Sequence, residues 1–133
     1  MILGSCLCGL VKYQSDMLVG PIIFCHCSFC RKSSSSSFSS NSIVDKDTFK
    51  VVEGEEYIQT YESSPGKVRH FCSNCHTQLF HSKEGVDKIT LKLGTVDTIT
   101  QDISGLEKFH INCESDRVLT QYENLPKYEL GKK

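Results

Sequence analysis

The chain has 133 residues, the length of about one domain, and 38% of them are hydrophobic, which is enough for one modest core. Its 15 basic and 16 acidic residues give a formal charge of −1, which provides no basic surface for nucleic acid. The longest apolar run, residues 17–24, is interrupted by Gly20 and Pro21 and is too short to span a membrane. The N-terminal residues lack the basic and apolar regions of a signal peptide, so we expect a soluble cytoplasmic protein that binds neither nucleic acid nor membrane.

Short alternating segments rich in β-branched and aromatic residues recur along the chain, separated by Gly, Pro, Asp and Ser. Alternation of apolar and polar residues indicates strands with one buried face, and helical periodicity is poor throughout. We therefore predict a mainly β, mainly antiparallel single domain. The predicted strands are 10–14, 22–27, 49–52, 57–61, 68–72, 78–81, 88–93 and 108–113.

Three segments between or after these strands carry further predictions. Gly54, in an acidic stretch between two strands, predicts a hairpin that joins 49–52 to 57–61. Helix is expected only as a short turn after Cys30 and near 115–121, within a domain core of about 4–122, and a frayed tail is expected from 125 to 133. The segment 33–42 holds eight serines, a composition that also suits a flexible linker. Because Phe38, Ile43 and Val44 can anchor it, we favour an ordered loop and strand there.

Seven of the eight cysteines form tight groups, and such spacing suits a metal better than disulfides in a reducing compartment. Zinc holds each sulfur at about 2.3 Å, so its ligands must converge closely. Two doublets supply four thiolates for a closed structural site, and the triplet supplies three and leaves one position open. The doublets are Cys6 with Cys8 and Cys72 with Cys75, the triplet is Cys25, Cys27 and Cys30, and Cys113 stands alone.

An alternative grouping is a single zinc ribbon made of Cys27, Cys30, Cys72 and Cys75. It leaves three of the clustered cysteines unexplained, so we prefer two zinc sites per chain. Cysteine spacing does not distinguish zinc from iron in the four-sulfur site.

Five blocks of sequence resemble the glutathione-dependent formaldehyde-activating family, which also occurs as the domain of centromere protein V. The likeness extends over about residues 4–112, and the joint cysteine pattern is its most specific part. The blocks are Gly4-Ser5-Cys6-Leu7-Cys8-Gly9, Cys25-His26-Cys27-Ser28-Phe29-Cys30-Arg31-Lys32, Phe71-Cys72-Ser73-Asn74-Cys75, Gly94-Thr95-Val96-Asp97 and His110-Ile111.

The resemblance implies a fold similar to the Rab-exchange-factor-like zinc β fold, with a structural zinc on the two doublets and a site zinc on the triplet. The implied activity is condensation of glutathione with formaldehyde to S-(hydroxymethyl)glutathione, by an enzyme of the carbon–sulfur lyase class. The alternative is a non-catalytic zinc scaffold or protein-interaction module. Three features depart from the family pattern: Ser35 and His76 stand where glycine is usual, and the Trp that often follows His-Ile is missing after Ile111. Such a glycine often has a positive φ, which other residues adopt at a cost.

Several polar residues near the motifs are candidates for the site. His110 is the best candidate for acid–base catalysis. Arg31, Lys32 and Arg69 can bind the carboxylates of glutathione, although each also suits a solvated or charge-balancing role. We expect His26, on a strand between two ligands, to point away from the metal. Cys113 is expected to be a small buried apolar residue.

Overall fold

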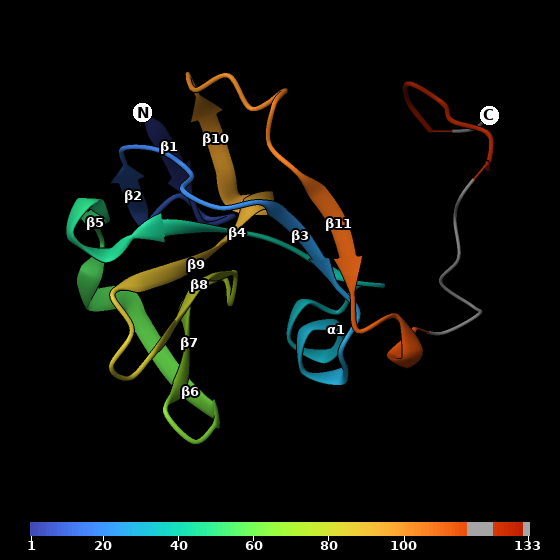
Figure 1. The fold of residues 1–133 in the computed structure, drawn as a ribbon. Coiled ribbons are helices and arrows are strands. Elements are labelled where there is room, and N and C mark those ends of the chain that lie inside the picture. The colour runs from blue at the N-terminus through green and yellow to red at the C-terminus, as the bar shows by residue number, and fades with distance from the viewer. Residues whose placement is uncertain (117–123, 132–133) are drawn as a thin grey trace.

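The computed structural model describes residues 1–116 and 124–131, and within them the chain forms two β-sheets. Figure 1 shows the smaller sheet beside the larger one, which runs from β11 to β6. The smaller sheet has the order β10-β1-β2-β5, with β1 (Ile2–Ser5), β2 (Lys12–Ser15), β5 (Lys50–Glu53) and β10 (Val96–Ile99). The larger has the order β11-β3-β4-β9-β8-β7-β6, with β3 (Ile22–Cys25), β4 (Ser39–Asp45), β6 (Ile58–Ser64), β7 (Lys67–Cys72), β8 (Gln78–Lys83), β9 (Lys88–Lys92) and β11 (Lys108–Ile111).

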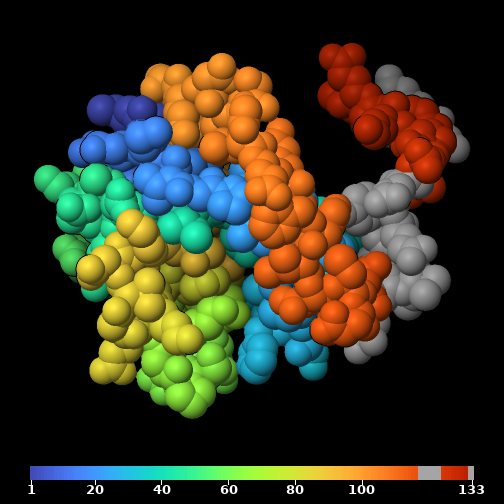
Figure 2. Space-filling model, in the orientation of Figure 1, coloured from blue at the N-terminus to red at the C-terminus, as the bar shows by residue number. Residues whose placement is uncertain are grey.

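Helical structure is limited to one short helix and isolated 3₁₀ turns in the described part of the chain. Helix α1 (Ser28–Ser34) lies next to the ends of β3 and β11 (Figure 1). The segment that contains β11 lies at the surface of the molecule beside this helix (Figure 2). The 3₁₀ turns are η1 (Lys46–Thr48), η2 (Glu55–Tyr57), η3 (Leu93–Thr95) and η4 (Cys113–Ser115). The helix brings the serine-rich segment, which continues into β4, next to the cysteine triplet. Among the described residues, no helix has the length and apolar character that crossing a membrane requires.

The strand pairings confirm a mainly antiparallel β protein. Within the described residues, β11 with β3 is the one parallel pair, and it sets Ile111 opposite Cys25. The eight predicted strands are all present, within a few residues of their predicted ends. Sequence reasoning missed β1 and β10, which pair with each other in the smaller sheet.

The predicted hairpin around Gly54 is wrong. Strand β5 pairs with β2 in the smaller sheet, whereas β6 pairs with β7 in the larger. Gly54 does turn the chain, with a φ of +78°, but a Cβ there would overlap the backbone oxygen of Leu10. The glycine is therefore needed because the chain that leaves β5 passes close to the backbone just before its partner strand β2.

The serine-rich segment is ordered, as we favoured over a linker. Its first residues end α1, and from Ser39 it forms β4 in the middle of the larger sheet. Asn41 and Ser42 of this strand are buried. The predicted helix at 115–121 lies mostly outside the described residues, and so does the very end of the predicted frayed tail.

The apolar core lies between the two sheets. Ile2, Val11 and Tyr13 contribute from the smaller sheet and its loop, while Val44 and Leu91 contribute from the larger. A Cβ at position 4 would overlap the Tyr13 ring, so a glycine is required where this ring crosses β1. The Tyr13 hydroxyl lies 2.8 Å from the Thr95 hydroxyl, which satisfies both groups inside the core.

The opposite face of the larger sheet is polar although much of it is buried. Arg69, His81 and Thr90 lie directly opposite one another on β7, β8 and β9, and Lys92 follows two residues later on the same face. Arg69 Nη1 donates to Ser33 Oγ of α1 at 3.2 Å, so the helix packs on this face. Because side chains alternate along a strand, the register places Cys25 on the same polar face.

Candidate metal centres and the pocket beside them

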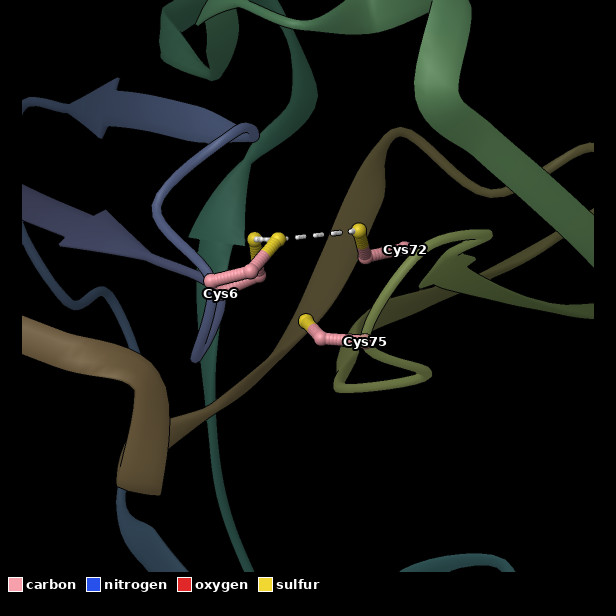
Figure 3. A group of neighbouring side chains, drawn as sticks. Cys6, Cys72 and Cys75 are labelled. Atoms are coloured by element: carbon pink, nitrogen blue, oxygen red, sulfur yellow. Dashed lines mark hydrogen bonds between the residues drawn. The ribbon is translucent and has the colours of Figure 1, made fainter.

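The four cysteines of the two doublets converge at the junction of the two sheets. Cys6 and Cys8 lie in the loop between β1 and β2, Cys72 ends β7, and Cys75 follows in a tight turn. Figure 3 shows Cys6 facing Cys72 and Cys75 across the gap between these loops. All four sulfur atoms lie within 4.8 Å of one another, with Cys6 and Cys8 Sγ 3.6 Å apart. This spacing suits a tetrahedral four-sulfur metal site.

The loops around this cluster supply hydrogen bonds to the sulfurs. The Val11 N–H donates to Cys6 Sγ at 3.3 Å, and Thr77 Oγ1 lies 3.2 Å from Cys75 Sγ. Burial raises the pKa of Cys6 to about 11. Desolvation also opposes ionisation of Cys75, but hydrogen bonds from Thr77 lower its pKa to about 5. The cluster therefore combines a thiolate-stabilising turn with a buried thiol, and a bound cation would replace the remaining protons.

The three cysteines of the triplet form a second, separate cluster. Cys25 ends β3, Cys27 is the N-cap of α1, and Cys30 lies in the first turn of that helix. Their sulfurs also lie within 4.8 Å of one another. Burial raises the pKa of Cys30 to about 11, against the opposing charge of Lys92. Asn112 Nδ2 donates to Cys25 Sγ at 3.3 Å.

The donor sets of both clusters fit a thiophilic metal. All eight cysteines are free thiols, and the two clusters offer four and three sulfur ligands. The single zinc ribbon considered as an alternative is not formed, because Cys27 and Cys30 group with Cys25 and not with Cys72 and Cys75.

The histidines near the clusters occupy distinct positions. His26 is buried, and its Nε2 lies 2.8 Å from His110 Nδ1 while its Nδ1 lies 3.2 Å from Asp116 Oδ1. His110 pairs with Phe24 on β3, so alternation places its side chain on the sheet face opposite to that of Cys25. His110 thus connects to the triplet through His26, and its catalytic role stays a prediction.

Two other histidines and the lone cysteine belong to neither cluster. His70 stacks on Phe80 with ring centroids 4.2 Å apart, and its Nε2 lies 3.1 Å from Ser82 Oγ. His76 is exposed. The expectation that Cys113 is buried is wrong, because this residue is exposed on the short turn η4.

The three predicted carboxylate-binding cations are not all in one place. Arg31 Nε donates to the backbone oxygen of His26 at 3.1 Å. Lys32 and Arg69 line a pocket of about 420 Å³ together with Phe29 and Tyr61. Arg69 is only 4% exposed, and its Nη2 has no hydrogen-bond partner. This pocket therefore has a buried, partly unsatisfied guanidinium in its wall.

A second pocket of about 440 Å³ lies between the serine-rich segment and the turn that carries Cys75. Ser35 and His76 both line it, and both have a positive φ, of 54° and 65°. These are the two positions where the sequence departs from the family's glycines. The departures therefore meet at one pocket, on backbone that glycine adopts most easily.

Sequence reasoning missed two polar residues beside the triplet, Asn112 and Lys92. Lys92 is 6% exposed, lines the second pocket, and donates from Nζ to Ser39 Oγ at 3.1 Å and Asn41 Oδ1 at 3.0 Å. In an alternating strand a lysine usually indicates a solvated face, so the sequence pattern does not distinguish the buried Lys92 from an exposed lysine. Asn112 has a φ of 56°, a conformation that asparagine tolerates well, but this leaves no clear signal in the sequence.

The fold and the two thiol clusters define a small, cysteine-rich β protein equipped to bind metal. The chain belongs to the glutathione-dependent formaldehyde-activating enzyme family, whose model matches residues 1–115. Its fold is similar to that of a crystal structure of a Rhodobacter sphaeroides protein, with a TM-score of 0.64 at 20% sequence identity. That likeness covers 80% of this chain and 97% of the other.

Proposed function

We propose that this protein is a zinc-dependent enzyme of the carbon–sulfur lyase type that joins glutathione to a small aldehyde such as formaldehyde. The product is S-(hydroxymethyl)glutathione. The observation that carries the proposal is the three-thiol cluster, which lies next to two cation-lined pockets in a chain of this family. Eight free thiols also suit the reducing cytoplasm, where we place the protein.

Both clusters are proposed to hold zinc, with different roles. Cys6, Cys8, Cys72 and Cys75 would fill all four positions of a structural ion. Cys25, Cys27 and Cys30 would hold the second ion. Zinc held by these three thiolates would favour the thiolate, the nucleophilic form, of a substrate thiol at neutral pH.

The chain's own residues would bind and orient the two substrates. The thiol gives up its proton, its sulfur forms a bond to the aldehyde carbon, and the carbonyl oxygen becomes an alkoxide that takes up a proton. Arg69 and Lys32 line a pocket where a carboxylate of glutathione can bind. Arg31 precedes Lys32 on helix α1. Water or His110, which is connected to the triplet through His26, supplies the final proton.

A glutathione–formaldehyde exchange assay by NMR tests this proposal. The protein purified without chelator should hold about two zinc equivalents by elemental analysis and should accelerate the exchange well above the uncatalysed rate. His110→Ala should lower the rate without loss of metal. An exchange rate equal to that of buffer, at full metal occupancy, would contradict the proposal.

Two exposed apolar residues favour the second candidate function, a zinc scaffold that binds a protein partner. Leu7 is 87% exposed between Cys6 and Cys8, and Phe29 is 55% exposed between Cys27 and Cys30. A scaffold needs a metal with no exchangeable position. Cobalt-substituted protein whose absorption spectrum does not change on addition of glutathione would favour the scaffold over the enzyme.

A further inference from the structure

Lys92 is a buried cation whose hydrogen-bond partners are both neutral. It ends β9 on the polar face of the larger sheet and is only 6% exposed. Its Nζ donates to Ser39 Oγ and Asn41 Oδ1, and Ser39 Oγ itself donates to Asn41 Oδ1 at 2.8 Å. An ammonium group has three N–H donors, so this arrangement fixes two and leaves the third for the pocket that Lys92 lines.

No carboxylate of the described residues neutralises this charge. The ion pairs found there are Lys12 with Glu53, His26 with Asp116 and Lys88 with Asp45. Burial lowers the pKa of Lys92 to about 8, and the positive charges of Arg69 and Lys67 act in the same direction. Burying a cation without a counter-ion is costly, so the fold maintains this charge against several opposing effects.

The triplet lies near Lys92 on the same face of the larger sheet. The register explains the proximity, because Cys25 lies directly opposite Ser39, which accepts the hydrogen bond from Lys92. Strand β4, which carries Ser39, therefore lies between the strand of Cys25 and the strand of Lys92. The pocket that Lys92 lines is also lined by Ser33 and Ser34 of α1.

We propose that Lys92 is the anion anchor of the thiol site, and that it binds a carboxylate of the substrate thiol in the 440 Å³ pocket between α1 and the Cys75 turn. This inference rests on the proposed function and adds a residue and a place for specificity. The carboxylate supplies the missing counter-ion, and Ser39 and Asn41 hold the ammonium in position before the ligand arrives. A volume of this size suits a ligand as small as a tripeptide thiol.

The test compares glutathione with its dimethyl ester, in which both carboxylates are neutral. Cobalt-substituted protein at pH 7.0 reports binding of either thiol through a change in the absorption spectrum of the triplet site. The wild-type protein should bind glutathione at least about tenfold more tightly than the ester, as expected for a hydrogen bond between charged groups. Equal affinities would overturn the assignment of an anion anchor. A spectrum that responds to neither thiol would overturn the proposed function and this inference with it.

The variant Lys92→Met then tests the residue itself. It should keep both metal equivalents and its affinity for the ester, while the preference for glutathione over the ester falls by about tenfold. Lys50→Met, which removes the same charge from an exposed position on β5, should keep the wild-type preference. Lys92→Gln retains a donor without the charge and replaces Lys92→Met if that variant fails to fold. An unchanged preference, or equal weakening of both ligands, would show that Lys92 only balances the charge of the cluster and would overturn the proposal.

Discussion

The two cysteine clusters differ in what they connect. The four-thiol cluster joins a loop of the smaller sheet to the end of β7 in the larger, with Cys8 and Cys72 Sγ 3.8 Å apart across 64 residues of sequence. Its buried members Cys6 and Cys72 belong to the core. The three-thiol cluster spans only Cys25 to Cys30, within one sheet and the helix that follows it. A metal at the first site closes a long loop, whereas a metal at the second constrains little beyond its own turn.

The surroundings of the clusters differ as well. The four-thiol cluster is adjacent to the apolar core between the sheets. The triplet lies on the polar face, which buries Arg69, His81 and Lys92 without a carboxylate partner among the described residues. Polar groups that are buried at such cost are typical of functional sites. We therefore propose that the first cluster stabilises the fold and the second carries the chemistry, and the following changes test that division.

The largest effect is expected from Cys72→Ser, which removes a buried ligand of the four-thiol cluster. Loss of this metal should cost the fold at least about 3 kcal/mol, or roughly 15 °C in Tm, because the two sheets lose their link. Thermal unfolding followed by circular dichroism measures it. Cys113→Ser, at an exposed thiol outside both clusters, is the control and should leave Tm within a degree or two. A Tm and metal content equal to wild type in Cys72→Ser would break the division.

Cys27→Ser should give the opposite pattern. Because this ligand belongs to the local cluster, we expect one metal equivalent to be lost and aldehyde–thiol exchange to fall to the uncatalysed rate. The other equivalent should remain, and Tm should drop by much less than in Cys72→Ser. Elemental analysis, the NMR exchange assay and thermal unfolding measure the three quantities on one sample. Full turnover in Cys27→Ser would contradict the proposed chemistry.

The polar face predicts a pH effect at His81, whose buried Nδ1 has no hydrogen-bond partner. Desolvation, helped by the charges of Lys92, Lys67 and Arg69, lowers the pKa of His81 to about 2. The unfolded chain has a histidine pKa of about 6.5 and binds a proton below that pH, while the folded chain does not. Stability is therefore lost as the pH falls from about 6.5 toward 2.

At pH 5.5 this linkage amounts to about 1.4 kcal/mol relative to pH 7.5. Urea unfolding of wild type and His81→Gln at both pH values isolates it, because the proton dependence of the metal ligands is common to both proteins. The wild type should lose about 1.4 kcal/mol more than the variant over this interval. Parallel losses would show that water reaches His81 and that this face is less desolvated than the structure indicates.

The sequence predicts both clusters because thiolate ligands must be close in space, and the cysteines within each of the three groups are already close in sequence. It predicts the strands because alternation follows from one buried face. It does not predict that β5 and β6 separate at Gly54, since the contact with Leu10 that decides this is tertiary. The roles of Lys92 and Asn112 could not be predicted for the same reason. Each is a single polar residue whose contacts depend on which strand lies next to it.

Each cluster is followed in the chain by one residue with left-handed backbone, Ser35 after the triplet and His76 after Cys75. Replacing these residues is expected to give the smallest changes in stability. Ser35 ends the helix that carries Cys30, with the Ser36 N–H donating to the Arg31 oxygen at 3.2 Å, and His76 directly follows Cys75. A non-glycine residue pays about 1–2 kcal/mol for this conformation, and glycine loses about 0.5–1 kcal/mol in backbone entropy. The net expectation is that Ser35→Gly and His76→Gly each stabilise the fold by about 0.5–1 kcal/mol.

The neighbouring Ser34→Gly is the matched control, because Ser34 is the last residue of α1 and its hydroxyl donates to the Cys30 oxygen at 2.7 Å. Glycine there should destabilise the fold by about 0.5–1 kcal/mol, so the sign of the effect should reverse between adjacent serines. Urea unfolding resolves such differences when the slope of the transition is unchanged. If His76→Gly is stabilising but lowers affinity for glutathione, the strained turn helps to shape the pocket. Destabilisation by both Ser35→Gly and His76→Gly would show that their side chains make contacts worth more than the backbone strain.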